Sequence, residues 1–121
     1  MSKILIVEDS VTQREIISDF LQNNGLEVVM AKDGVEALDY LQNCSPDLVV
    51  LDVVMPRMNG YEVCRNLKSN PQTKGVPVIM CSSKKEEFDR YWGMRQGADA
   101  YLIKPFKPAD FLSTIEKLLN P

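Results

Sequence analysis

The sequence contains no histidine and only three cysteines among its 121 residues. Without histidine, the chain has no Ser-His-Asp or Cys-His arrangement and no histidine general base. It also has no phospho-histidine of its own, so any phosphoryl donor must be another molecule. The cysteines are widely spaced and form no Cys-x-x-Cys pair, which argues against a zinc site. We therefore expect free thiols in a reducing cytoplasm.

Long apolar runs and basic clusters are also missing. No hydrophobic stretch approaches the ~20 residues needed to cross a bilayer, and the N-terminus has no signal-peptide core. The net charge is −3, and no basic run is interleaved with aromatic residues, so we expect neither a nucleic-acid nor a membrane partner. The length is close to the commonest domain size, which predicts a single domain over residues 1–121.

Five short apolar runs alternate with five amphipathic stretches. The runs predict strands at residues 3–7, 27–31, 48–52, 76–81 and 100–103. Continuous Val- and Leu-rich runs are typical of strands buried on both faces, as in a parallel sheet covered by helices. Regular strand–helix alternation implies right-handed crossovers with helices on both faces. The predicted fold class is α/β, a doubly wound domain with a five-stranded parallel sheet.

Two of the predicted helices begin with capping-box patterns, Ser10 with Gln13 and Ser83 with Glu86. The first helix should end at Gly25 and the fourth near residue 96. The apolar face of the first helix is predicted to consist of Val11, Ile16, Ile17, Phe20 and Leu21. The fourth helix is rich in large side chains, some of which must pack inward, and these are Phe88, Tyr91, Trp92 and Met94.

The stretch 47–56 organises the rest of the chain. Asp52 ends the apolar run 48–51, and Pro56 prevents the strand from simply continuing. A carboxylate at the end of such a strand lies at the sheet edge where open α/β folds place their ligand sites. A simpler interpretation is that Asp52 only stops a strand or caps a loop.

Polar residues follow the other predicted strands at the same edge. Glu8 and Asp9 follow the first strand, Ser82 and Ser83 the fourth, and Lys104 the fifth. Clustered carboxylates repel one another unless a cation is present, and oxygen ligands suit Mg²⁺. A lysine supplies a mobile point charge for a phosphate oxygen.

This set of residues fits a phosphoryl group on Asp52, with Mg²⁺ and Lys104 balancing its charge. Each residue taken alone has a simpler interpretation. Glu8 or Asp9 could cap the first helix, Ser82 could cap the fourth, and Lys104 could be a solvated loop lysine. The joint pattern favours the phosphoryl site, because every one of these residues falls at the same kind of position.

Over nearly its whole length the chain resembles the receiver domains of two-component response regulators. The matching segments are Ile-Leu-Ile-Val-Glu-Asp-Ser at 4–10, Leu-Asp-Val-Val-Met-Pro-Arg-Met-Asn-Gly at 51–60, Pro-Val-Ile-Met-Cys-Ser-Ser at 77–83 and Gly-Ala-Asp-Ala-Tyr-Leu-Ile-Lys-Pro-Phe at 97–106. The resemblance implies a flavodoxin-like (βα)5 three-layer sandwich with strand order 2-1-3-4-5.

The resemblance also implies a role for each site residue. Asp52 is the expected phosphoacceptor, and Glu8, Asp9 and the backbone carbonyl of Val54 are expected to join it in binding Mg²⁺. Lys104 corresponds to the phosphate-binding lysine and precedes a cis peptide bond to Pro105. Ser82 corresponds to the switch hydroxyl, although threonine is more frequent there. Val54 is apolar at a position near the attacking water where some members of the family carry a polar residue.

Tyr101 falls at the position of the family's rotating aromatic residue. The resemblance implies that phosphorylation moves Ser82 toward the phosphoryl group and Tyr101 inward, and so reshapes the face made by the fourth helix, the fifth strand and the fifth helix. A half-buried aromatic residue on a strand is the simpler interpretation of Tyr101.

The implied partners are a sensor histidine kinase or phosphotransfer protein and a downstream protein target. The protein would be a monomer or a weak phosphorylation-dependent dimer. The chain ends just after the last helix, so we expect a stand-alone regulator. Residues 91–98 resemble stand-alone regulators of type IV pilus motility and phototaxis.

Three rival functions share parts of this pattern. An aspartate-nucleophile phosphatase usually has a second acid two residues after the nucleophile, and here that residue is Val54. A flavodoxin-type electron carrier needs a loop rich in Ser, Thr and Gly after the first strand, where this chain has Glu8-Asp9-Ser10. A pseudo-receiver would be an interaction module that is never phosphorylated.

Overall fold

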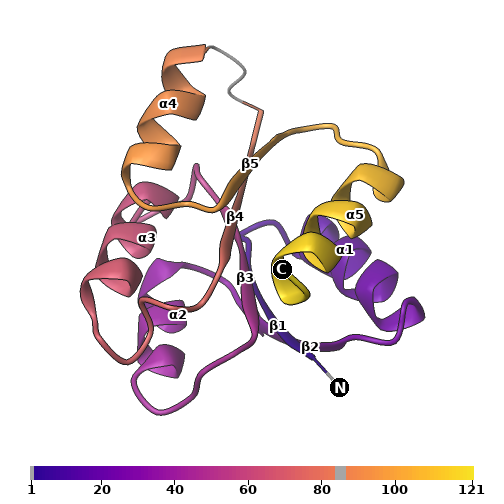
Figure 1. The fold of residues 1–121 in the computed structure, drawn as a ribbon, viewed down its shortest axis with the longest axis horizontal. Coiled ribbons are helices and arrows are strands. Elements are labelled where there is room, and N and C mark those ends of the chain that lie inside the picture. Colours follow the sequence, from indigo (N-terminus) through magenta and orange to yellow (C-terminus); the bar gives the residue numbers. More distant parts are fainter. Residues whose placement is uncertain (1, 84–86) are drawn as a thin grey trace.

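The structure is a computed structural model that describes residues 2–83 and 87–121. In these residues, strands and helices alternate along the chain (Figure 1). The strands are β1 (Lys3–Val7), β2 (Glu27–Ala31), β3 (Leu48–Asp52), β4 (Val78–Ser82) and β5 (Ala100–Ile103). The helices are α1 (Val11–Asn23), α2 (Gly34–Leu41), α3 (Gly60–Ser69), α4 (Glu87–Arg95) and α5 (Pro108–Leu119).

The strands form one parallel sheet in the order β2-β1-β3-β4-β5, which confirms the predicted flavodoxin-like doubly wound fold. In Figure 1, α2, α3 and α4 cover one face of the sheet, and α1 and α5 cover the other. Because successive strand residues point to opposite faces, β1 supplies both hydrophobic cores. Leu5 and Val7 face one core, and Ile4 and Ile6 face the other.

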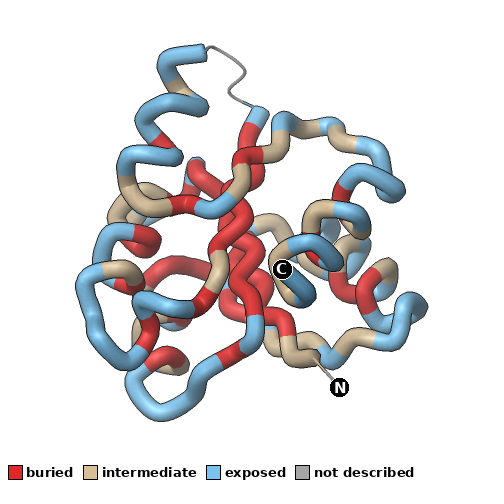
Figure 2. Tube along the Cα trace, in the orientation of Figure 1, coloured by how far each residue is buried: buried red, intermediate tan, exposed pale blue. Residues whose placement is uncertain are grey.

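The middle of the sheet is the most deeply buried part of the molecule (Figure 2). Every residue of β3 and β4 is buried, as expected for inner strands of a sheet covered on both faces. β4 begins at Val78, two residues later than predicted, and extends to Ser82. No helix in the described residues is long and apolar enough to cross a membrane.

In the described part of the chain, short polar side chains start three of the helices. Each accepts a hydrogen bond from the backbone N–H three residues later, which satisfies a donor that the first helical turn leaves unpaired. These pairs are Ser10 with Gln13, Asp33 with Glu36, and Asn59 with Glu62. Pro108 occupies the first turn of α5, as predicted. The capping box predicted for Ser83 and Glu86 lies partly outside the described residues.

The predicted inward face of α1 is partly wrong. Leu21 is buried, and Ile17 and Phe20 pack against the core, but Val11 and Ile16 are 57% and 62% exposed. Adjacent helical residues point about 100° apart. Because the Ile17 side chain points to the sheet, the Ile16 side chain points away from the sheet. Ser18, a polar residue, is buried in its place.

The prediction that some large side chains of α4 pack inward is also wrong. All four of them are between 42% and 71% exposed, and these are Phe88, Tyr91, Trp92 and Met94. Gly93 is the buried residue of this helix. Its missing side chain lets the helix backbone approach Met80 on β4 and Tyr101 on β5. The helix therefore packs through its backbone and leaves its aromatic side chains on the surface.

Candidate functional site

Asp52 is the last residue of β3 and is 8% exposed. The chain that follows it is fixed on two sides. The N–H of Val53 donates to the carbonyl of Cys81 at 3.1 Å, and the Val53 carbonyl accepts from the N–H of Gly60 at 2.8 Å. A β-carbon on Gly60 would clash with the Asp52 carbonyl oxygen. The start of α3 therefore lies against the end of β3 and holds Asp52 in place.

Three carboxylates meet at this edge of the sheet. Glu8, Asp9 and Asp52 each place one oxygen within 4.8 Å of the others. Glu8 is buried and also accepts a hydrogen bond from the N–H of Ser10 at 3.2 Å, whereas Asp9 is exposed. Closely spaced oxygen ligands with one exposed member suit Mg²⁺, which keeps several of its waters. The residues present therefore fit this ion.

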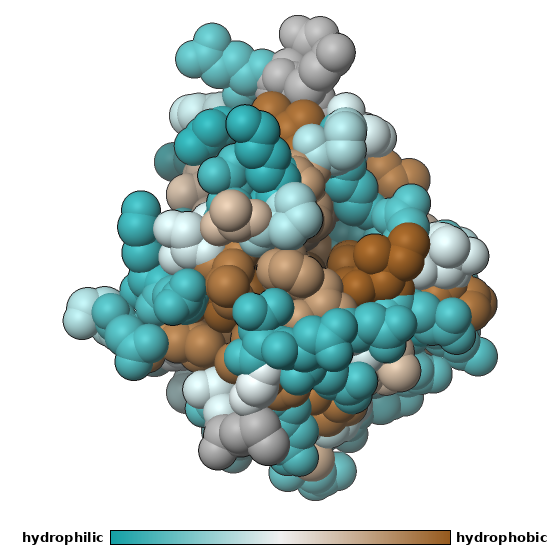
Figure 3. All heavy atoms as spheres, turned by 90° about the vertical axis from the view of Figure 1, so that its right-hand side faces the viewer, coloured by the Kyte–Doolittle hydropathy of each residue, from teal (hydrophilic) through white to brown (hydrophobic). Residues whose placement is uncertain are grey.

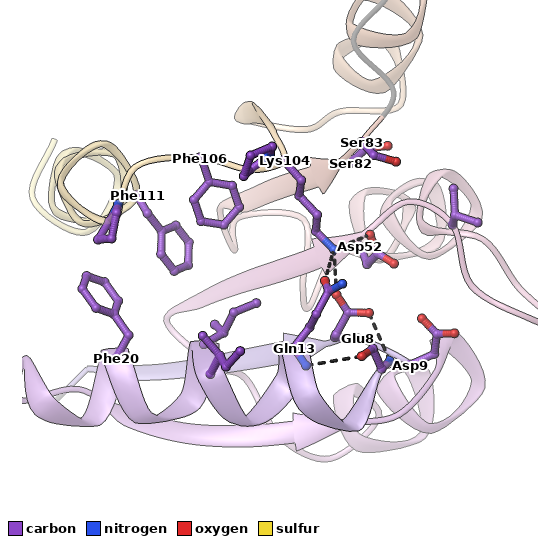
Figure 4. Close-up of a pocket in the computed structure, with 16 residues that line it drawn as sticks. Glu8, Asp9, Gln13, Phe20, Asp52, Ser82, Ser83, Lys104, Phe106 and Phe111 are labelled. Atoms are coloured by element: carbon purple, nitrogen blue, oxygen red, sulfur yellow. Dashed lines mark hydrogen bonds and ion pairs between the residues drawn. The ribbon is translucent and has the colours of Figure 1, made fainter.

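Lys104 reaches the same point from the end of β5. Its Nζ lies 3.2 Å from Asp52 Oδ1, 2.8 Å from Glu8 Oε1 and 2.7 Å from Gln13 Oε1 (Figure 4). The backbone N–H of Lys104 donates to the Ser82 carbonyl at 2.8 Å, which joins the ends of β4 and β5. The following bond to Pro105 is cis, as the resemblance implied.

The charges of this cluster shift the pKa of two groups. Burial and the neighbouring carboxylates of Glu8 and Asp9 raise the pKa of Asp52 to about 6, although Lys104 acts in the opposite direction. Burial alone would lower the pKa of Lys104, but the hydrogen bond to Glu8 and the charge of Asp52 raise it above its ordinary value. The cluster thus holds more negative charge than one lysine balances, and a cation would relieve it.

All the remaining predicted residues except Tyr101 line a cleft of about 670 Å³ above this cluster. Ser82 and Ser83 border it from the end of β4, and Val54, more than half exposed, borders it from the loop after β3. The cleft continues between α1 and α5, where its walls are apolar, and the residues there include Ile16, Ile17, Phe20, Phe106 and Phe111. Figure 3, which looks onto this side of the molecule, shows apolar side chains in a hollow.

Tyr101 lies away from the acidic cluster, beneath α4, and is 5% exposed. Tyr61 on α3 is its neighbour. Burial and the nearby Tyr101 hydroxyl, with which Tyr61 shares a hydrogen bond, raise the pKa of Tyr61 to about 12. The Tyr61 hydroxyl also donates to the backbone carbonyl of Asp89 on α4 at 3.4 Å. Tyr101 is therefore buried more deeply than the half-buried position that its simpler interpretation assumed, and its switch role stays a prediction.

Sequence reasoning missed Tyr61 and Gln13. Gln13 was predicted only as the third residue of a capping box, and its backbone N–H does bond Ser10 Oγ. Its side chain, however, turns toward Lys104 instead of back to the cap (Figure 4). A long polar side chain in the first turn after the acidic pair is the signal that could have indicated this contact.

Three carboxylates and a lysine thus meet at the carboxyl edge of a flavodoxin-like sheet. The family model for the response regulator receiver domain matches residues 4–116. The chain therefore belongs to the receiver-domain family of two-component signal transduction. Members of this family are signalling domains and not classical enzymes, which disfavours the phosphatase and flavodoxin alternatives.

Individual relatives agree with this assignment. Protein PilH of Pseudomonas aeruginosa is 38% identical over 119 residues, with 98% of each chain covered. The probable transcriptional regulator ycf27 of Cyanophora paradoxa is 43% identical over 118 residues, but the chain spans only 48% of its length. The chain therefore matches one relative end to end and about half of a longer one.

Solved structures show the same fold. Chemotaxis protein CheY4 of Vibrio cholerae matches with a TM-score of 0.92, at 36% identity, over 98% of this chain and 99% of that one. The receiver domain of sensor histidine kinase PA1611 from Pseudomonas aeruginosa also gives a TM-score of 0.92, at 26% identity, over 99% of this chain and 98% of that one. That receiver domain has a magnesium ion coordinated in its active-site cleft.

Proposed function

We propose that this protein is a phosphorylation-dependent switch that accepts a phosphoryl group on Asp52. One observation carries the proposal. Lys104 Nζ lies 3.2 Å from Asp52 Oδ1, and Asp52 belongs to a cluster of three carboxylates that lines a cleft. Because the chain lacks histidine, the phosphoryl donor must be another molecule. Membership of the receiver-domain family supports a phospho-histidine on a sensor histidine kinase or phosphotransfer protein as that donor.

In the proposed reaction, an oxygen of the ionised Asp52 attacks the phosphorus of the donor's phospho-imidazole. A P–O bond forms as the P–N bond breaks, and the electron pair returns to the imidazole nitrogen of the donor. Lys104 donates a hydrogen bond to a phosphoryl oxygen and balances part of its charge. The burial of Asp52 limits competition from water for the same contacts.

Glu8, Asp9, Asp52 and the backbone carbonyl of Val54 are the residues that would hold Mg²⁺. The ion would neutralise charge on the carboxylates and on the transferring phosphoryl oxygens. A pKa of about 6 leaves Asp52 mostly ionised at neutral pH, and partial neutralisation of its neighbours would favour the ionised form further. The clustering of the three carboxylates within 4.8 Å supports this assignment.

Ser82 and Tyr101 would carry the signal away from Asp52. Ser82 borders the cleft beside Asp52, and Tyr101 follows two strands away beneath α4. Phosphorylation would shift a pre-existing equilibrium of these two side chains and of the α4–β5–α5 face. The exposed Phe88, Tyr91 and Trp92 on α4 support a protein partner there.

The proposal also covers where the protein acts and in which oligomeric state. The protein would act in the cytoplasm as a single receiver domain, as a monomer or as a weak dimer that forms on phosphorylation. The match with PilH over 98% of each chain supports a role in motility, and the type IV pilus branch stays a prediction. The specific alternative is an unphosphorylated pseudo-receiver.

The test is intact-mass spectrometry after incubation with acetyl phosphate and Mg²⁺. The wild type should gain one phosphoryl group, Asp52→Asn should gain none, and a chelator added beforehand should prevent the gain. If the wild type stays unlabelled under conditions that label a known receiver domain, the pseudo-receiver alternative replaces the proposal.

A further inference from the structure

We infer that Gln13 is a positioning residue that holds the Lys104 ammonium group over Asp52. The inference rests on the proposed function and adds to it a residue outside the matched motifs. Among the described residues, Gln13 Oε1 makes the shortest of three contacts with Lys104 Nζ, at 2.7 Å. The contacts with Glu8 and Asp52 are 2.8 Å and 3.2 Å long.

The three acceptors of Lys104 come from three different places in the fold. Glu8 follows β1, Asp52 ends β3, and Gln13 lies in the first turn of α1. An ammonium group has three N–H donors and no acceptor, so each donor has one oxygen to bind. A lysine with three fixed acceptors loses the rotational freedom of its long side chain before the reaction begins.

The acceptors differ in what else they can bind. Glu8 and Asp52 belong to the carboxylate cluster that fits Mg²⁺, and Asp52 is also the proposed phosphoacceptor. A carboxylate that binds a cation becomes a weaker acceptor for an ammonium group. Gln13 is a neutral amide outside that cluster, so its oxygen stays available to Lys104 when the carboxylates are engaged. Gln13 therefore contributes most to the position of Lys104 when the carboxylates bind Mg²⁺.

The cost of losing this contact follows from the flexibility of lysine. Without Gln13, the Lys104 ammonium group could turn out of the cleft when Mg²⁺ occupies the carboxylates. The lysine would then have to return to its position before each phosphoryl transfer. We expect Gln13→Met, which keeps the length and helix propensity of the side chain, to slow labelling by acetyl phosphate about three- to tenfold. Gln22→Met, on an exposed part of the same helix, should label at the wild-type rate.

A second measurement separates positioning from a structural role of the first turn. The ¹⁵N NMR signal of the Lys104 ammonium group, identified by its loss in Lys104→Met, reports how firmly the group is held. On addition of Mg²⁺, this signal should stay sharp in the wild type and broaden in Gln13→Met. Gln13→Glu, which keeps an oxygen acceptor at the same reach, should keep the signal sharp.

The outcomes are distinguishable. Equal labelling rates for wild type and Gln13→Met would overturn the inference and leave the proposed function intact. Slower labelling with an unchanged ammonium signal would overturn it too, because Gln13 would then support only the helix. If the wild type itself is not labelled, the proposed function is wrong, and the inference about Gln13, which rests on it, is wrong as well.

Discussion

Gly93 of α4 and the ring of Tyr101 on β5 pack directly against each other. A β-carbon on Gly93 would lie 3.0 Å from Cδ2 and 3.3 Å from Cε2 of Tyr101, closer than side chains normally approach. Glycine inside a helix costs about 1 kcal/mol relative to alanine. The buried position of the Tyr101 ring thus depends on the absence of a side chain at residue 93.

Gly93→Ala should displace the Tyr101 ring outward, because the ring and the new methyl group compete for one space. The usual gain of about 1 kcal/mol from Gly to Ala in a helix should be absent in the wild-type background and appear in a Tyr101→Ala background. Urea unfolding of the wild type, the two single variants and the double variant measures this difference. ¹⁹F NMR of fluorotyrosine at position 101 reports the position of the ring. Equal stabilisation in both backgrounds would contradict the packing argument.

Asp52→Asn should stabilise the metal-free protein at neutral pH. The pKa of Asp52 is about 6 in the folded protein against 3.8 ordinarily, so the folded state binds more protons than the unfolded state between these values. The wild type therefore loses stability as the pH rises through this window. The amide variant should be about 1–3 kcal/mol more stable above pH 6, and the two proteins should converge below pH 4.

Urea unfolding at a series of pH values with a chelator present measures this effect. Asp19→Asn, on an exposed part of α1, is the matched control and should follow the wild type throughout. A gain that is independent of pH would show that the charge of Asp52 is not its source.

Mg²⁺ should stabilise the folded protein, because the carboxylate cluster exists only when the chain is folded. At 100 times the dissociation constant the expected gain is about 2.7 kcal/mol. Asp9→Asn removes one ligand without disturbing a buried group and should reduce the gain. Thermal unfolding with Mg²⁺, compared with NaCl at equal ionic strength, separates binding from screening. Equal effects of the two salts would exclude a specific site.

Gly60→Ala should destabilise the protein by about 2–4 kcal/mol, since the new methyl group meets backbone and not a flexible side chain. It would clash with the Asp52 carbonyl oxygen and lie 2.9 Å from Val53 Cα. Any folded fraction should accept the phosphoryl group more slowly, because Asp52 shifts. Gly75→Ala is the matched control. A β-carbon at Gly75 meets no atom within 4 Å, so that variant should unfold at the wild-type urea concentration or above it.

The residue pattern alone was sufficient to predict a parallel sheet and the alternation of strands and helices along the chain, and the family resemblance added the spatial order of the strands. Runs such as 48–51 and the breakers between them are local signals, and parallel strands bring their carboxyl ends together whatever the helices do. That is why Glu8, Asp9, Asp52 and Lys104 could be assigned to one edge. Their individual roles were implied by the resemblance and stay proposals, since geometry brings groups together without showing that they react.

Only the tertiary structure decided which side of each helix faces the sheet and where long side chains turn. Ile16 lies in the wall of the cleft and not in the core, because Ile17 takes the direction toward the sheet. α4 packs through Gly93 because Tyr101 fills the space beneath it. Gln13 bonds Lys104, although they lie 91 residues apart in the chain. Local patterns specify the strands and caps. Contacts across the chain depend on how the layers pack, and no short stretch of sequence contains that information.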